Sequence, residues 1–280
     1  MKLKKLSLTL SLFAFAATPA SALVIMISDL SPAGAPIEAW FTDNFSNVTE
    51  VRHGDFANFS NAASQEALNG TGAYAGMGAA DIFVIGRSLS SGGYGSGNAD
   101  GYNSIAIPFI NMTSYTARGA GNRLGWHDGS AGNTGSRNGE ETTVTAIGGA
   151  LLGVPAGTYD LWTDDLNFNG VGTSTNVGTG DILATLDGNL IAAHWDAGDA
   201  PGDTVSAGVA TFPGTRLLLN IDNEPNAGNS GANDFTGLTA LGTQAYAGVI
   251  AATTPLEQVP EPSTGILGLL GLGLVLRRRR

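Results

Sequence analysis

Few side chains in this 280-residue chain could act as nucleophiles or as proton carriers. The chain has no cysteine, and its only histidines are His53, His127 and His194. Ser88 follows the apolar run 82–85 and is a candidate nucleophile, with His127 as the base that would take its proton. The sequence around Ser88, Gly-Arg-Ser-Leu-Ser, lacks the Gly-x-Ser-x-Gly spacing of a nucleophile elbow. We therefore expect binding or a structural role, and we keep extracellular hydrolysis as the alternative.

One segment begins like a calcium-binding loop. Asp165, Asn167 and Asn169 supply oxygen atoms at positions 1, 3 and 5, and Gly170 stands at position 6. Asn176 occupies position 12, where such a loop needs a bidentate glutamate, so we expect a solvated turn and no metal site. Other acids offer an alternative set of calcium ligands without a supporting pattern, namely Asp196, Asp199 and Asp203.

A ligand site is expected where the predicted strands end. Ligands of open α/β sheets bind outside the carboxyl ends of the strands, and arginine beside aromatic rings suits a carboxylate or a sugar. The polar and aromatic residues that fall there are Asp29, Arg87, Ser88, Tyr115, Arg118 and Trp126. The alternative is that the two arginines only pair with acids and cap loops in an acidic protein.

The elements that would position these residues alternate between strands and helices. Apolar runs predict strands over 23–27, 48–51, 81–86 and 105–112, and helices over 36–45 and 60–68 lie between them. Further strands are predicted over 143–147, 180–186, 190–194 and 216–221, followed by a helix over 233–250 and a linker over 251–259. This order predicts an α/β fold with an open, mostly parallel, flavodoxin-like sheet and flanking helices. A separate β-sandwich in the second half is the alternative.

The segments "NVTEVRHGDF", "ADIFVIGRSLSSGGY" and "IPFINMTSYTARGAGNRLGWHDG" resemble ThuA-like proteins, which have the class I glutamine amidotransferase-like fold. The later segments "ILATLDGNLIAAHWDAG" and "TRLLLNIDN" resemble the closing strands of the same family, so the resemblance covers most of residues 23–250. It implies a link to carbohydrate metabolism. Amidotransferases of this fold use a cysteine, so the cysteine-free chain excludes that activity.

The charge of the chain limits its partners. Between residues 23 and 258 there are six arginines, no lysine and 23 acidic residues, so this segment carries a net charge of about −17. Nucleic acid and anionic lipid both require neutralisation of phosphate charge, and this balance argues against them. The balance suits a solvated extracellular protein.

The first 22 residues have the pattern of a cleavable signal peptide. Lys2, Lys4 and Lys5 precede an apolar run over 6–17. Ala20 and Ala22 place small residues at the −3 and −1 positions of a cut after Ala22. We therefore expect signal peptidase to release a mature chain that begins at Leu23.

The C-terminus has a second targeting pattern over 260–280. Val259-Pro260-Glu261-Pro262 is followed by an apolar run over 263–276 and then by Arg277, Arg278, Arg279 and Arg280. Fourteen helical residues rise about 21 Å, which is short for a permanent membrane span. The arginines would hold that end in the cytoplasm during a transient membrane anchorage.

The Pro-Glu-Pro triplet, the apolar run and the arginine cluster, in this order at the C-terminus, resemble a PEP-CTERM sorting signal. The membrane protease-transpeptidase exosortase recognises such signals. The resemblance implies export through the inner membrane and delivery to the cell surface or the extracellular matrix. The expected partners are thus signal peptidase and exosortase, and a carbohydrate or exopolysaccharide is the ligand we consider for the domain.

Overall fold

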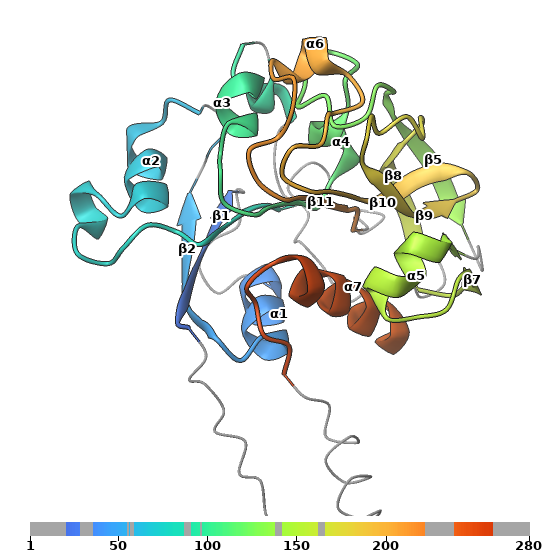
Figure 1. Ribbon diagram of the computed structural model, residues 1–280, viewed down its shortest axis with the longest axis horizontal. Helices are drawn as coiled ribbons and strands as arrows, with labels where there is room; N and C mark the ends of the chain where they lie inside the picture. The colour runs from blue at the N-terminus through green and yellow to red at the C-terminus, as the bar shows by residue number, and fades with distance from the viewer. Residues whose placement is uncertain are drawn as a thin grey trace, which may run out of the picture.

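The computed structural model describes residues 21–28, 36–54, 56, 59–86, 91–95, 97–137, 142–161, 166–221 and 238–259, with the backbone alone for 132–137 and 166–171. Within this part of the chain, eleven strands form one mixed sheet. Nine of them follow the order β2-β1-β3-β4-β11-β10-β9-β6-β7; β8 pairs with β10 and β5 pairs with β8. Helices cover both faces of this sheet (Figure 1).

The strands are β1 (Leu23–Ser28), β2 (Val48–Gly54), β3 (Ile82–Ile85), β4 (Phe109–Asn111), β5 (Ala131–Arg137), β6 (Thr142–Val144), β7 (Gly157–Tyr159), β8 (Leu166–Gly172), β9 (Asp181–Leu186), β10 (Asn189–Trp195) and β11 (Arg216–Leu219). The α-helices are α1 (Pro36–Asn44), α2 (Ala62–Asn69), α3 (Ala99–Asn103), α4 (Ser114–Ala117), α5 (Ala146–Leu152), α6 (Thr204–Ala207) and α7 (Ala240–Thr253). Two 3₁₀ turns, η1 (Gly72–Tyr74) and η2 (Ser91–Tyr94), flank β3.

The first half of the sheet is parallel. Ile25 of β1 pairs with Val51 of β2 on one side and with Ile82 of β3 on the other, both in parallel register. β4 continues this arrangement between β3 and β11. Ile25, Met26 and Ile27 are fully buried because helices cover both faces, as is usual for parallel strands. The predicted α/β class is confirmed.

The second half of the sheet is antiparallel. β10 pairs antiparallel with β11 and with β9, and β6 pairs antiparallel with β9 and β7. Asp187 and Gly188 connect β9 to β10, both with positive φ, as a tight two-residue hairpin requires. The sheet is thus more mixed than the mostly parallel one we expected. The alternative of a separate β-sandwich is wrong, because these strands extend the same sheet.

Two predicted strands are shorter in the structure. The run 105–112 forms a strand only over Phe109–Asn111, because the carbonyl groups of Ile105 and Ile107 accept hydrogen bonds from the Arg216 guanidinium. The run 143–147 ends at Val144, since Thr145 caps helix α5: its Oγ1 accepts the Gly148 N–H at 2.9 Å.

The core has two parts, one on each face of the sheet. On one face, α1, α5 and α7 lie side by side, and Phe41 and Tyr246 are fully buried there (Figure 1). On the other face lie α2, α3, α4 and α6 (Figure 1), and the core on this side includes an aromatic cluster with Phe109, Trp126 and Trp195. Neighbouring rings of this cluster meet edge to face, with centroids 4.9 to 5.5 Å apart.

The segment 251–259 belongs to the folded domain, which corrects our expectation of a linker. Helix α7 continues to Thr253, and Leu256 is buried. Gln258 bridges to Phe45, and the Val259 N–H donates to the Asn44 carbonyl at 2.8 Å. The contacts of the folded domain therefore extend at least to Val259, directly before Pro260.

Residues 1–20 of the predicted signal peptide (1–22) and the predicted sorting signal over 260–280 lie outside the described residues. Among the helices that are described, none is both long enough and apolar enough to cross a membrane.

Candidate functional site

The carboxyl ends of β1, β3, β4 and β11 meet at one edge of the sheet. Since α1 and α2 cover opposite faces, the strand order changes direction between β1 and β3, and such a switch point is where open α/β sheets bind ligands. Ser28 ends β1 here, and its Oγ is 2.5 Å from the Tyr94 hydroxyl and accepts the Phe56 N–H. This edge is the candidate functional site.

Half of the predicted ligand set cannot be placed. Asp29, Arg87 and Ser88 lie outside the described residues, and so does Asp165 of the calcium-like loop. The predicted pairing of Ser88 with His127 therefore stays a prediction.

Trp126 is part of the core. Its indole is fully buried among Phe109, Trp195 and Phe212, and its Nε1 donates to Asn103 Oδ1 at 2.9 Å. A ligand would contact this ring only if the aromatic cluster opened.

The ends of β4 and β11 carry a network of buried polar side chains. Asn111 Oδ1 accepts hydrogen bonds from Thr116 Oγ1 at 2.8 Å and from the Thr113 N–H at 3.1 Å. Asn220 Oδ1 accepts the Ser114 N–H at 2.9 Å. Asn111 Nδ2 and Ser114 Oγ are buried and have no hydrogen-bond partner among the described residues. Buried polar atoms of this kind usually bind water or a ligand.

His127 lies against the same network. The Gly119 N–H donates to its backbone carbonyl, and its imidazole is fully buried. Both ring nitrogens lack a hydrogen-bond partner among the described residues. Burial lowers the pKa of His127 to about 4, and the negative charge of Asp128 and the Ser114 backbone oppose this only in part. The ring is therefore neutral at pH 7, so it can both donate and accept a proton, but it is closed off from solvent.

Among the predicted ligand residues that the structure describes, Tyr115 and Arg118 reach the surface. Both are half-buried, and the Arg118 guanidinium lies over the Tyr115 ring, 5.5 Å from its centroid. This cation–π contact fixes the direction of the guanidinium. These two side chains therefore lie together beyond the end of β4, on helix α4 and the residue after it.

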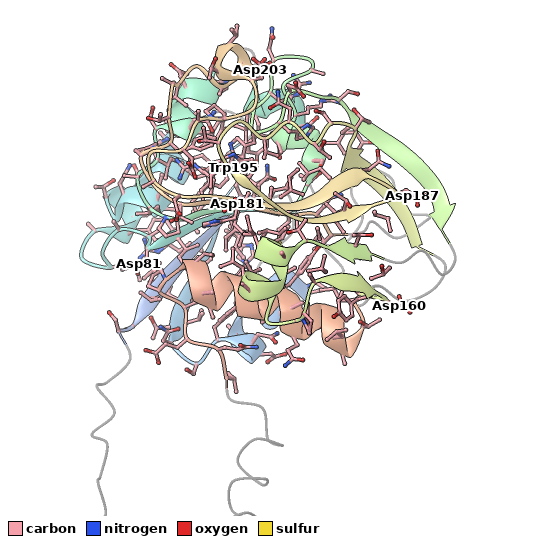
Figure 2. The ribbon with its side chains drawn as sticks, turned by 45° about the vertical axis from the view of Figure 1, so that its right-hand side comes forward. Asp81, Asp160, Asp181, Asp187, Trp195 and Asp203 are labelled. Atoms are coloured by element: carbon pink, nitrogen blue, oxygen red, sulfur yellow. The ribbon has the colours of Figure 1, made fainter. Side chains whose placement is uncertain are left out.

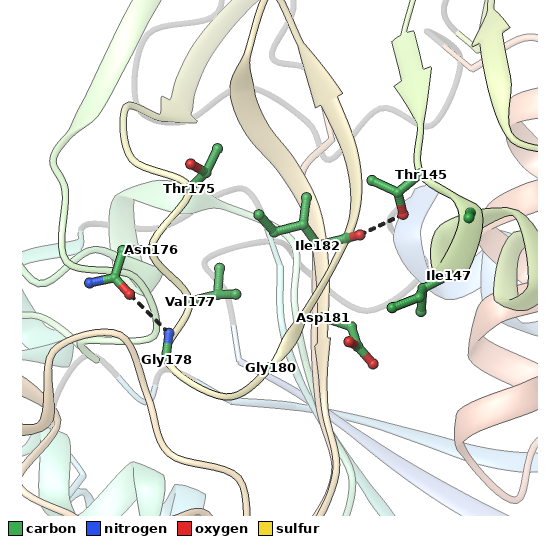
Figure 3. A pocket seen from close by; sticks show the side chains of 10 residues that line it. Thr145, Ile147, Thr175, Asn176, Val177, Gly178, Gly180, Asp181 and Ile182 are labelled. Carbon is green, nitrogen blue, oxygen red and sulfur yellow. Dashed lines mark hydrogen bonds between the residues drawn. The ribbon is translucent and has the colours of Figure 1, made fainter.

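A shallow cavity of about 540 Å³ lies at another part of the surface (Figure 3). Its walls come from the start of α5, the start of β9 and the loop that precedes β9, and they include Thr145, Ile147, Asn176 and Asp181. The amide of Asn176 is already bound to Asp128 and to the Gly178 N–H. Sequence reasoning did not select this cavity as a binding site, since its residues are neither aromatic nor grouped by type.

The described residues contain no group of three or more histidine and acidic side chains that could hold a metal ion. Asp81, Asp160, Asp181, Asp187 and Asp203 are spread around the domain (Figure 2). Two of the alternative calcium ligands serve turns and caps. Asp199 accepts hydrogen bonds from the Asp196 N–H and from Thr179, and Asp203 caps α6.

The chain was compared with known proteins. Residues 258–280 match the model of the PEP-CTERM protein-sorting motif. This match indicates an exported surface protein that exosortase processes, in agreement with the sequence analysis. No curated protein matches the chain. The resemblance of residues 23–250 to ThuA-like proteins stays a prediction.

Proposed function

We propose that the chain is secreted with a cleaved signal peptide, anchored transiently in the inner membrane, and then released by exosortase to the cell surface or the extracellular matrix. The observation that carries this proposal is the sorting motif over 258–280. The first two residues of the motif still contact the domain, since Gln258 bridges to Phe45 and the Val259 N–H is bound to the Asn44 carbonyl. Removal of the tail after Val259 would leave these contacts intact.

The N-terminus supports the same order of events. Leu23 is the first residue of β1, it is buried, and its N–H donates to the Asn47 carbonyl at 3.0 Å. Ala22 is exposed. A cut after Ala22 would therefore leave the sheet complete. Both ends of the domain lie beside Asn47, so the two targeting segments are attached at the same end of the molecule.

Mass spectrometry of the mature protein from its native host tests this proposal. The expected masses correspond to an N-terminus at Leu23 and a C-terminus close to Pro260–Pro262. In the matched control, a variant with alanine at Pro260, Glu261 and Pro262 should keep its tail. A wild-type protein that ends in intact Arg277–Arg280 would contradict processing by exosortase.

For the domain itself, we propose binding of a carbohydrate or exopolysaccharide at the carboxyl edge of the sheet, on a flavodoxin-like, ThuA-like scaffold. Tyr115 and Arg118 support this proposal because they stand together, partly exposed, at the end of β4. The alternative is a carbohydrate-active hydrolase. Carbohydrate binding and hydrolysis are distinguished by incubating the protein with oligosaccharides and measuring both complex formation and new reducing ends. Binding without new reducing ends supports the first, and turnover supports the second.

A further inference from the structure

Two arginines at the carboxyl edge lie close together although no acid among the described residues pairs with either of them. Arg118 follows α4, and Arg123 stands in the loop that leads on to Trp126. A Cβ atom built on Gly121 would lie 4.0 Å from Arg118 Nη2 and 4.0 Å from Arg123 Nη1. These two guanidinium nitrogens therefore lie near the same point, at most twice that distance apart.

The positive charge of Arg118 affects the neighbouring Arg123 guanidinium. Burial lowers the pKa of Arg123, and the positive charge of Arg118 lowers it further. Two like charges at close range repel each other, and the folded chain bears this cost. An anion between them would convert the repulsion into two attractive contacts.

Within the described part of the chain, no carboxylate forms an ion pair with Arg118 or Arg123. The Nε atoms of both are buried and lack a hydrogen-bond partner there. The nearby acids have other partners: Asp128 binds Ser174 and Asn176, and Asp203 binds Ser206.

The other two arginines with described side chains make more hydrogen bonds, although Arg216 Nε is also buried without a partner among the described residues. Arg52 makes two hydrogen bonds to Glu50 and three to backbone carbonyls. Arg216 donates to five backbone carbonyls. Compared with Arg52 and Arg216, Arg118 and Arg123 have more guanidinium N–H groups without a hydrogen-bond partner among the described residues. Both side chains are also partly exposed to solvent.

The local backbone holds the pair in place. Gly121 and Asn122 both have positive φ, so the chain turns sharply between the two arginines. Gly95 packs beneath this turn: a Cβ there would lie 2.0 Å from the Asn122 carbonyl oxygen and 3.1 Å from Arg123 Cδ. Tyr115 supports Arg118 from its ring face. The guanidinium groups are thus presented on a braced loop, which lowers the entropic cost of binding.

We propose that Arg118 and Arg123 form a binding site for a single oxyanion, such as the carboxylate of an acidic sugar. Guanidinium groups match the geometry of carboxylate, sulfate and phosphate oxygens. The net charge of about −17 between residues 23 and 258 repels densely charged polyanions, so the site favours a ligand with isolated negative charges. The inference deepens the proposed carbohydrate binding and does not depend on the sorting of the chain.

Isothermal titration calorimetry on the full chain in a mild non-ionic detergent tests the site. The probes are trigalacturonate, the neutral trisaccharide galactotriose, and inorganic sulfate as a free oxyanion. The variants are Arg118→Gln, Arg123→Gln, both together, and Arg118→Lys with Arg123→Lys. The four tail arginines are present in every variant, so their contribution cancels in the comparison. A thermal melt of each variant confirms that it is folded.

The wild type should bind trigalacturonate, and each glutamine change should weaken binding about tenfold, since it removes charge-assisted hydrogen bonds. The double glutamine variant should lose binding, and the double lysine variant should be intermediate because it keeps the charge without the forked donors. Salt should weaken binding. Binding of sulfate without trigalacturonate would support an oxyanion site for a free anion.

Two results would overturn the inference. The first is unchanged affinity for trigalacturonate or sulfate in the double glutamine variant. The second is that neither anionic probe binds. If galactotriose binds with the same affinity to the wild type and to the double glutamine variant, the proposed carbohydrate binding stands and the oxyanion site does not. The two proposals can therefore fail separately.

Discussion

Asn47 and Glu257 are 210 positions apart in the chain, and the Asn47 side chain joins them: its Oδ1 accepts the Glu257 N–H at 2.9 Å. The same amide group donates from Nδ2 to the Pro255 carbonyl at 3.0 Å, and the Asn47 backbone carbonyl accepts the Leu23 N–H. One buried residue thus binds both ends of the domain.

Replacing Asn47 with alanine should destabilise the domain. The change removes two long-range hydrogen bonds and leaves the Glu257 N–H and the Pro255 carbonyl without these partners, which should lower the free energy of unfolding by about 2 kcal/mol. Urea denaturation followed by circular dichroism measures the change. Asn69→Ala is the matched control, because Asn69 is exposed and, among the described residues, its amide binds Gln65 of the same helix. Equal midpoints for the two variants would contradict the role of Asn47.

Local patterns predicted the parallel half of the sheet well. The run at Leu23 is short, continuous and β-branched, and it forms the buried strand β1. The spacing of Ile37, Trp40 and Phe41 predicted a helix that buries these three residues, and α1 buries all of them. In both segments the signal lies within ten residues, so neither prediction required knowledge of distant contacts.

Residues whose role depends on distant partners were harder to interpret. Trp126 was expected at a ligand site, but its indole binds Asn103 and packs in the core. The segment 251–259 has linker-like composition, yet its contacts are with Asn44 to Asn47, more than 200 positions earlier. Arg123 gave no signal at all, because its pairing with Arg118 depends on a sharp turn between them.

The stability of the domain should fall as the pH drops from about 6.5 to about 4 because of His127. Burial lowers the pKa of His127 from 6.5 to about 4, so in this range the unfolded chain binds a proton that the folded chain excludes. The loss should approach about 3 kcal/mol over the interval and be absent above it. Urea denaturation at several pH values measures it.

His127→Leu is the variant that isolates this effect. Leucine cannot titrate, and the ring nitrogens that it removes have no partner among the described residues. The variant should therefore keep its stability between pH 6.5 and pH 4 better than the wild type does. Asp128 has a lowered pKa because Ser174 and Asn176 donate hydrogen bonds to it, and both proteins share its contribution at lower pH. Parallel pH profiles for the two proteins would show that His127 is not the source.

Replacing Arg216 with methionine should destabilise the domain strongly. The buried guanidinium donates to carbonyls that include those of Asn103 and Ile105, and it lies over the rings of Phe109 and Phe212. Methionine fills similar space but leaves the carbonyls unpaired, at a cost of about 3 kcal/mol or more. Lysine at this position should also lower the free energy of unfolding, because its ammonium group cannot reproduce the planar set of guanidinium donors. Arg123→Met, at a half-buried position, is the control. A similar urea midpoint for both methionine variants would contradict a stabilising role of the Arg216 hydrogen bonds.

Two helix glycines, Gly148 of α5 and Gly248 of α7, should respond oppositely to alanine. A Cβ on Gly148 would lie 1.9 Å from the Leu183 carbonyl oxygen of β9, so α5 must move away from the sheet, at a cost of about 3 kcal/mol. A Cβ on Gly248 would lie 3.5 Å from the Leu152 carbonyl oxygen, an ordinary contact, and alanine should stabilise α7 by up to about 1 kcal/mol. Thermal melts of the two variants measure both changes. A Gly148→Ala variant that melts at or above the wild-type temperature would mean that α5 does not pack this closely on β9.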